Sequence, residues 1–172
     1  MKSQARWLSI LAISLAGAFT GSPLHADGNE ADPSYLVLGS GASYVLSSTK
    51  FSLVSAEYRF EEDYYGVHPY LLGCSRSNGD NYYFGAGLLY NFKLSPRWRI
   101  TISSGPGYYD HDRGSFNLGK SIEFYSNIEL STKIWHEQRL GLSFGHISNG
   151  GLGNHNPGAE TLRLVYAIPF RM

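Results

Sequence analysis

The sequence is poor in cysteine, in charged residues and in long apolar runs. Its single cysteine, Cys74, excludes an intramolecular disulfide and a cysteine-rich metal site. Charged residues make up 16% of the 172 residues, against roughly 25% in soluble domains. The formal net charge is zero, so the chain lacks the basic surface typical of nucleic-acid binding and we expect no nucleic-acid partner. No apolar run reaches the ~20 residues of a membrane-spanning helix.

Tyrosine and glycine are abundant instead, with 13 and 20 residues. This composition disfavours a helical bundle, which would be rich in Ala, Leu, Glu and Lys. The N-terminus has the pattern of a secretory signal peptide, because Lys2 and Arg6 precede a short apolar stretch, Trp7–Phe19, and a small-residue cleavage site ends at Ala26. We therefore expect residues 1–26 to be removed on export and residues 27–172 to form one domain.

Apolar and polar residues alternate with a period of two through residues 27–172, which is typical of β-strands with two different faces. The pattern is clearest where Tyr82, Phe84 and Leu88 share one face and Gly85 and Gly87 share the other. Eight such runs are separated by short polar segments, at residues 35–46, 54–60, 67–75, 82–92, 98–103, 122–130, 140–145 and 161–171. The sequence thus predicts an all-β protein of eight antiparallel strands.

Two architectures fit this pattern: a soluble lipid-binding barrel or sandwich with an apolar core, and a transmembrane β-barrel with an apolar exterior. The transmembrane barrel is favoured because the polar faces carry Gly, Ser, Thr and Asn rather than the Lys of a solvated surface. We expect the charged residues on these faces to pair inside a narrow barrel: Glu57, Arg59, Arg99, Glu123, Glu129 and Arg163. Aromatics near the strand ends suggest interfacial girdles: Tyr35, Tyr58, Phe60, Tyr90, Phe92, Trp98, Tyr108 and Tyr109. An exported barrel of this kind belongs in a bacterial outer membrane, in contact with membrane lipids.

Three polar residues interrupt the apolar faces of the last two strands. By alternation, His146 and Ser148 continue the face of Leu142 and Phe144, and Glu160 continues the face of Leu162. A serine becomes a nucleophile when a histidine takes its proton, and a carboxylate can orient that histidine. If the two strands form a hairpin, Glu160 is expected diagonally opposite His146, about 7–8 Å away and within reach of long side chains.

Donors for an oxyanion are available in the segment between these strands, where Asn149, Asn156 and the Gly150–Gly151 backbone lie. The alternative is that Gly, Asn and Pro here form an ordinary turn and that the His and Ser are interfacial polar residues. On spacing alone, both interpretations stay open.

The motifs His146-Ile-Ser148-Asn149 and Asn156-Pro-Gly-Ala-Glu160 resemble the PagL family of lipid A 3-O-deacylases, which are eight-stranded outer-membrane enzymes. The resemblance implies that Ser148 is the nucleophile, His146 the general base and Glu160 the residue that orients His146. It further implies Asn156 as oxyanion donor, the Gly151 backbone as a second donor, and a supporting role for Asn149. The implied substrate is lipid A of lipopolysaccharide, with no cofactor and no metal. With periplasmic termini, the segment 149–159 would lie outside the cell and face the outer leaflet.

Several alternatives accompany this hypothesis. Outer-membrane phospholipase A also carries a His-x-Ser-Asn-Gly stretch, but it uses calcium and has twelve strands, for which this chain is short. The alternative from another functional class is a barrel without enzymatic activity, with a structural or adhesin role. The segment Asp110–Arg113 resembles a metal-ligand cluster only in residue types, and a solvated loop after the fifth strand is the simpler interpretation. The sequence leaves open whether a second copy of the chain binds to form a homodimer.

Overall fold

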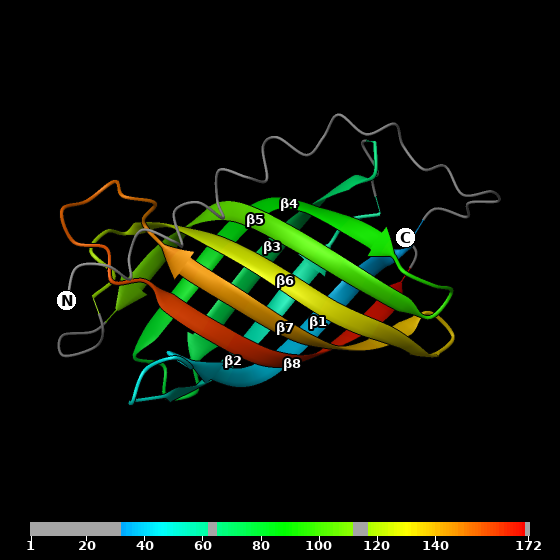
Figure 1. The fold of residues 1–172 in the computed structure, drawn as a ribbon, viewed down its shortest axis with the longest axis horizontal. Coiled ribbons are helices and arrows are strands. Elements are labelled where there is room, and N and C mark those ends of the chain that lie inside the picture. Colours follow the sequence, from blue (N-terminus) through cyan, green and yellow to red (C-terminus); the bar gives the residue numbers. More distant parts are fainter. Residues whose placement is uncertain (1–31, 62–64, 112–116, 171–172) are drawn as a thin grey trace. The chain divides into compact units, whose positions relative to one another are not determined.

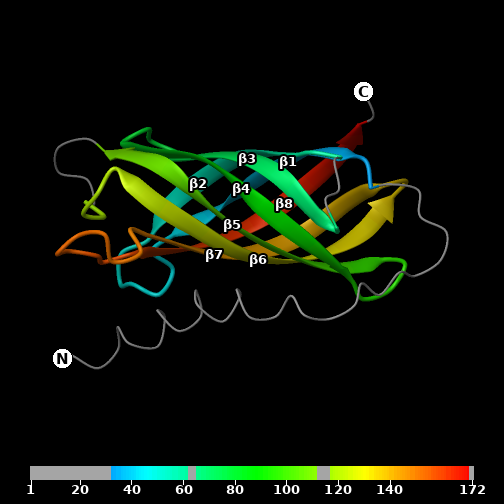
Figure 2. The same cartoon turned by 90° about the horizontal axis from the view of Figure 1, so that it is seen from above.

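The computed structural model describes residues 32–61, 65–111 and 117–170. The predicted signal peptide lies outside this range. Eight strands form a closed barrel in which each strand is antiparallel to its neighbours in the sequence and β8 closes onto β1, as Figures 1 and 2 show. They are β1 (Ser34–Ser43), β2 (Phe51–Arg59), β3 (Val67–Arg76), β4 (Asn81–Lys93), β5 (Trp98–His111), β6 (Ile122–Trp135), β7 (Gln138–Ser148) and β8 (Ala159–Phe170). None of the described residues forms a helix that would be long and apolar enough to cross a membrane.

The exterior of the barrel is predominantly apolar. Leu142 of β7 and Leu164 of β8 are 54% and 58% exposed, whereas the intervening Ser143 and Arg163 are almost completely buried. Strands of 9 to 14 residues match the length that crosses the hydrocarbon core, which is about 9–11 residues when tilted. A soluble barrel would bury its apolar face, so the prediction of an eight-stranded transmembrane β-barrel is confirmed.

The interior holds the polar and charged side chains, together with several tyrosines. Arg59 of β2 contacts Glu57 on its own strand and reaches Glu129 of β6 across the lumen, with Nε–Oε1 and Nη2–Oε2 distances of 2.7 and 2.5 Å. The expected ion pairs are incomplete, however. Arg163 donates instead to the hydroxyls of Ser55 and Ser143, each at 2.9 Å, and Glu123 forms no ion pair with any described residue.

Two predicted features of the aromatic residues and strand ends are wrong. Tyr35 and Tyr109 point into the lumen and are 3% and 6% exposed, so they do not belong to an interfacial girdle. The sequence pattern puts Asp110 and His111 after the fifth strand, but β5 continues through both of them. Lumenal aromatics at a strand end look like interfacial ones in sequence, because only the inward or outward direction distinguishes them.

The two ends of the barrel differ in the length of their connections. One end, which we call the loop end, carries the segments 44–50, 77–80, 112–121 and 149–158. The other end, the turn end, carries the shorter turns 94–97 and 136–137, the segment 60–66, and the start of β1 and end of β8. In Figure 1 the orange segment between β7 and β8 marks the loop end.

Candidate active site

The three candidate catalytic residues lie at the loop end, on the outer surface of two neighbouring strands. His146 and Ser148 continue the outward face of Leu140, Leu142 and Phe144 on β7, and both are partly buried. Glu160 occupies the second position of β8. The strand period of two therefore puts both β7 side chains on the same surface, as predicted.

His146 and Glu160 are direct cross-strand partners in the β7–β8 ladder, not the diagonal neighbours expected from the sequence. The distance between His146 Nδ1 and Glu160 Oε1 is 3.5 Å, which is an ion-pair distance slightly longer than a compact hydrogen bond. Catalytic hydrogen bonds are often this long before substrate binds. Because Nδ1 faces the carboxylate, Nε2 is the ring nitrogen left to act as the base.

Gly158 leaves the space that the imidazole of His146 occupies. This glycine is buried, and its φ of +65° lies in the left-handed region that favours glycine. A Cβ atom at this position would lie 2.7 Å from His146 Cε1 and 3.2 Å from Nε2. The glycine in the Asn-Pro-Gly-Ala-Glu motif thus makes room for the histidine ring as well as completing the turn.

Asn149, the residue after the candidate nucleophile, is completely buried and organises the segment between β7 and β8. Its Nδ2 donates to the carbonyl oxygens of His155 (2.8 Å) and Leu118 (3.1 Å), so it joins the β7–β8 segment to the β5–β6 segment. Its Oδ1 accepts from the Gly151 N–H at 3.0 Å. These three bonds indicate that Asn149 positions the loop rather than contacting a substrate.

The two predicted oxyanion donors differ in their availability. Asn156 is exposed, and its Oδ1 accepts the backbone N–H of Asn149 at 3.1 Å. Only the amide oxygen can accept this bond. The NH2 group of Asn156 therefore does not face the Asn149 N–H, and it is the part of the side chain that can donate to another group. The Gly151 N–H, by contrast, already donates to Asn149 Oδ1. It is therefore not the free second oxyanion donor that the resemblance implies.

A row of polar side chains extends from the site across the outer surface. The ladder registers place Ser104 opposite Ser126, Ser126 opposite His146, and His146 opposite Glu160, on β5 to β8. The two serine hydroxyl oxygens are 3.0 Å apart. The sequence motifs do not include these serines. Each of them nevertheless interrupts an otherwise apolar strand face, and the same kind of interruption identifies His146 in the sequence.

The aromatic residue beside the nucleophile is Phe124. It lies opposite Ser148 in the β6–β7 ladder and is 38% exposed. A Cβ atom on Gly150 would lie 3.3 Å from its ring, so the segment after Ser148 crosses close to this aromatic. An apolar surface therefore borders the site on the β6 side.

The weaker motif, Asp110–Arg113, falls only partly within the structure. Asp112 and Arg113 lie outside the described residues. Asp110 Oδ2 accepts from the Tyr82 hydroxyl at 3.0 Å, which is an ordinary cross-strand contact at the surface. Among the described residues, no group of three or more His, Cys, Asp or Glu side chains is arranged to hold a metal ion.

Fold and site together define a class: a transmembrane β-barrel with a serine, a histidine and a carboxylate on the outward face of adjacent strands. The family model described as Lipid A 3-O-deacylase (PagL) matches residues 53–169. This is more than half of the chain, so the chain belongs to the PagL family. The resemblance that the two motifs suggest is confirmed.

Two curated relatives are both named Lipid A deacylase PagL. The protein from Bordetella bronchiseptica is 31% identical over 81 residues, which cover 43% of this chain and 46% of that protein. The protein from Pseudomonas aeruginosa is 39% identical over 56 residues, which cover 33% of this chain and 32% of that protein. The matched part of the chain thus spans less than half the length of these relatives.

Among solved structures, the barrel is similar to the crystal structure of the outer membrane enzyme PagL. The TM-score is 0.62 at 20% sequence identity, and the match covers 79% of this chain and 99% of that chain. At this identity the comparison shows a common fold, which agrees with the closed barrel described above.

Proposed function

We propose that this protein is a lipid A 3-O-deacylase of the bacterial outer membrane, which hydrolyses the ester-linked 3-hydroxyacyl chain at position 3 of lipid A. The observation that carries the proposal is the cross-strand pair of His146 and Glu160 beside Ser148, on the surface of a barrel of the PagL family. Polar groups on a lipid-facing surface destabilise a barrel. Their presence here therefore points to a function. A lipid ester is the substrate that such a surface can reach.

The lengths of the connections support an orientation for the site. Outer-membrane barrels have short periplasmic turns and longer external loops. The turn end then faces the periplasm, and the loop end faces outward. Ser148, His146 and Glu160 lie at the loop end. In the proposed orientation, this end lies at the level of the outer leaflet, where lipopolysaccharide resides.

In the proposed reaction, Ser148 Oγ attacks the ester carbonyl while His146 Nε2 takes the hydroxyl proton. Glu160 holds Nδ1 and stabilises the imidazolium. The Asn156 NH2 group donates to the oxyanion, and the protonated His146 returns its proton to the 3-oxygen of the departing sugar. Water, activated by His146, then cleaves the acyl-enzyme and releases a 3-hydroxy fatty acid. Lipid A is left with a free 3-hydroxyl, and Ser148 is regenerated.

Two features of the barrel argue against the phospholipase alternative. Eight strands close it, whereas the phospholipase has twelve. In the proposed triad a carboxylate, that of Glu160, orients the histidine as its direct cross-strand partner, whereas the phospholipase uses an Asn. The proposed mechanism uses no residue from a second copy of the chain, so it does not require a homodimer.

The test is mass spectrometry of lipid A from Gram-negative cells that express the full chain. Wild-type protein should remove one 3-hydroxyacyl group, and Ser148→Ala should leave lipid A unchanged although the barrel is folded in the membrane. Heat-modified migration on gels verifies folding of each variant. Ser40→Ala is the matched control, because Ser40 is another serine on the outer face, here an exposed one, that lies opposite Leu164, away from the level of Glu160.

The outcomes separate the alternatives. Unchanged lipid A with folded wild-type protein would overturn the proposal and favour a non-enzymatic barrel. Calcium-dependent release of lysophospholipid would assign the site to phospholipid hydrolysis instead.

A further inference from the structure

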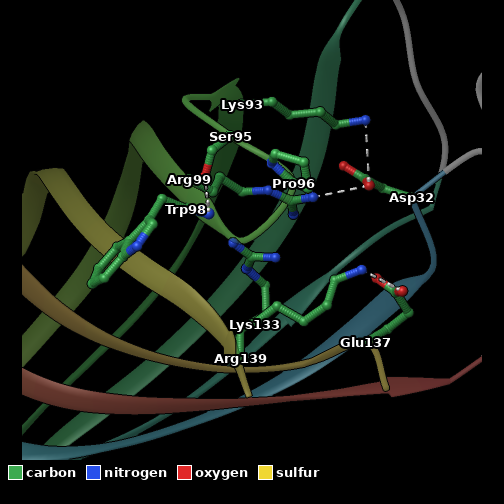
Figure 3. A pocket seen from close by; sticks show the side chains of 9 residues that line it. All are labelled: Asp32, Lys93, Ser95, Pro96, Trp98, Arg99, Lys133, Glu137 and Arg139. Carbon is green, nitrogen blue, oxygen red and sulfur yellow. Dashed lines mark hydrogen bonds and ion pairs between the residues drawn. The ribbon is translucent and has the colours of Figure 1, made fainter. Parts of the chain in front are cut away.

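We propose that the turn end of the barrel contains a binding site for a phosphate group, separate from the candidate active site and independent of its chemistry. The site is a pocket of about 150 Å³ at the mouth of the lumen. This volume is roughly ten times the ~10–15 Å³ that a cavity needs to hold one water molecule. Figure 3 shows its lining, to which the β4–β5 turn, the β6–β7 turn and the residues just before β1 contribute.

Positive charge exceeds negative charge among the residues that line the pocket. Four of them are cationic and two carry carboxylates: Lys93, Arg99, Lys133, Arg139, Asp32 and Glu137. Figure 3 shows that the guanidinium groups of Arg99 and Arg139 approach each other at the centre of the pocket, with the lysines at its sides. A pocket with this charge attracts anions.

Both carboxylates are already engaged by other side chains. Asp32 Oδ1 lies 2.9 Å from Arg99 Nη2 and 3.7 Å from Lys93 Nζ. Glu137 Oε1 lies 2.7 Å from Lys133 Nζ. Neither carboxylate contacts Arg139 within the distance of an ion pair, so the central arginine has no ion-pair partner among the described residues.

Arg139 is only 5% exposed, and the groups that accept its hydrogen bonds are all neutral. Its Nη2 donates to the carbonyl oxygens of Arg97 (2.8 Å) and Ser131 (3.3 Å), and its Nε donates to Ser131 Oγ (3.3 Å). Arg99 is 6% exposed, and its buried Nε has no hydrogen-bond partner among the described residues. A buried charge without a counter-ion is unfavourable, and a bound anion would remove this penalty.

The chemistry of the lining favours phosphate. Guanidinium groups present planar forks that match the oxygens of a phosphate, and lysine ammonium groups add compact charges at its edge. Trp98 lies on the outer surface of the same end and is 46% exposed. Tryptophan is enriched at the level of lipid head groups. The phosphate can therefore come from two sources: a phospholipid head group of the inner leaflet, or inorganic phosphate of the periplasm.

The experiment uses the refolded full chain with Ser148→Ala, so that no hydrolysis contributes, in a detergent with a sugar head group. Sodium phosphate and the short-chain lipid dihexanoyl phosphatidylglycerol are titrated at constant ionic strength, with sodium chloride as the reference. The melting temperature and the heat of binding are measured. A ligand that binds only the folded barrel raises the melting temperature in a saturable way.

Two variants probe the pocket, and one is a matched control. Lys93→Gln removes a side chain that is half exposed, so the barrel should fold, and Arg139→Gln removes the central charge. Lys50→Gln changes an exposed lysine at the loop end. We expect saturable binding that weakens at least tenfold in Lys93→Gln, weakens further in folded Arg139→Gln, and is unchanged in Lys50→Gln.

Binding of the lipid at least tenfold more tightly than phosphate would identify a head group as the source, and the reverse order would identify free phosphate. The proposal is overturned if neither ligand shifts the melting temperature beyond sodium chloride. It is also overturned if Lys93→Gln and Lys50→Gln bind equally well. Each of these results is independent of lipid A hydrolysis, so the proposed enzyme activity can fail while this site stands.

Discussion

His146 Nδ1 lies 3.5 Å from Glu160 Oε1, across the last hairpin of the barrel and on its outer surface. The relationship is fixed by the β7–β8 register, in which the two residues are direct partners. It turns Nδ1 of the histidine toward the carboxylate. In the proposed mechanism, the role of Glu160 is to select the tautomer of His146.

Glu160→Gln tests this role because the amide keeps the shape of the carboxylate but loses its charge. We expect kcat for lipid A deacylation to fall by about 10⁴-fold, as for the loss of the orienting carboxylate in serine hydrolases. Initial rates on lipid A in detergent micelles, followed by mass spectrometry, measure the change. A variant that keeps wild-type kcat would show that Glu160 is only an interfacial polar residue.

Gly158→Ala should displace the imidazole, since its Cβ would lie 2.7 Å from His146 Cε1 at a φ of +65°. We expect the rate to fall at least tenfold. Gly79→Ala is the matched control: Gly79 also has a positive φ, of +81°, but a Cβ there would meet nothing within 4 Å. Both variants carry a similar backbone penalty of about 1 kcal/mol. Equal activities of the two variants would contradict a specific effect on His146.

Asn156→Ala removes the proposed oxyanion donor and should lower kcat by about 10²- to 10³-fold with little change in KM. The stability of the barrel should fall only slightly, by about 1 kcal/mol, because the exposed Asn156 side chain accepts a single bond, from the Asn149 N–H. Measuring kcat, KM and the melting temperature of the variant distinguishes this outcome from a structural role. A rise in KM with unchanged kcat would indicate that Asn156 binds substrate instead.

Asn149→Ala should behave differently from Asn156→Ala, because Asn149 is buried and bonds three backbone groups of two segments. We expect a loss of about 1–3 kcal/mol of stability at the loop end together with reduced kcat. Amide hydrogen exchange of residues 117–121 and 150–156 reports the loosening. If exchange in these segments matches wild type, Asn149 does not hold the loop.

Much of this barrel follows from the sequence because strand periodicity is a local property. The alternation determines which face each residue occupies, so it is sufficient by itself to place Leu142, His146 and Ser148 on the outer surface. Strand register depends on two segments at once, however, and the sequence predicts a diagonal instead of a direct contact between His146 and Glu160. The pattern also misplaces Tyr35 and Tyr109, because an aromatic ring suits both a lumen and an interface.

The ion pair between Arg59 and Glu129 could not be predicted as a specific contact, because it joins β2 to β6 across the closed lumen. It provides the last test, of stability rather than activity. Glu129→Gln leaves the buried Arg59 guanidinium with Glu57 as its remaining carboxylate partner, and loss of the charge-assisted bonds to Glu129 should cost about 1.5–3 kcal/mol. Urea unfolding of the refolded barrel in lipid vesicles, followed by tryptophan fluorescence, should show a lower midpoint for this variant.

Lys133→Gln is the control, because its pair with Glu137 is partly exposed and worth at most about 1 kcal/mol. Equal midpoints for the two variants would mean that water enters the lumen and screens the Arg59–Glu129 pair.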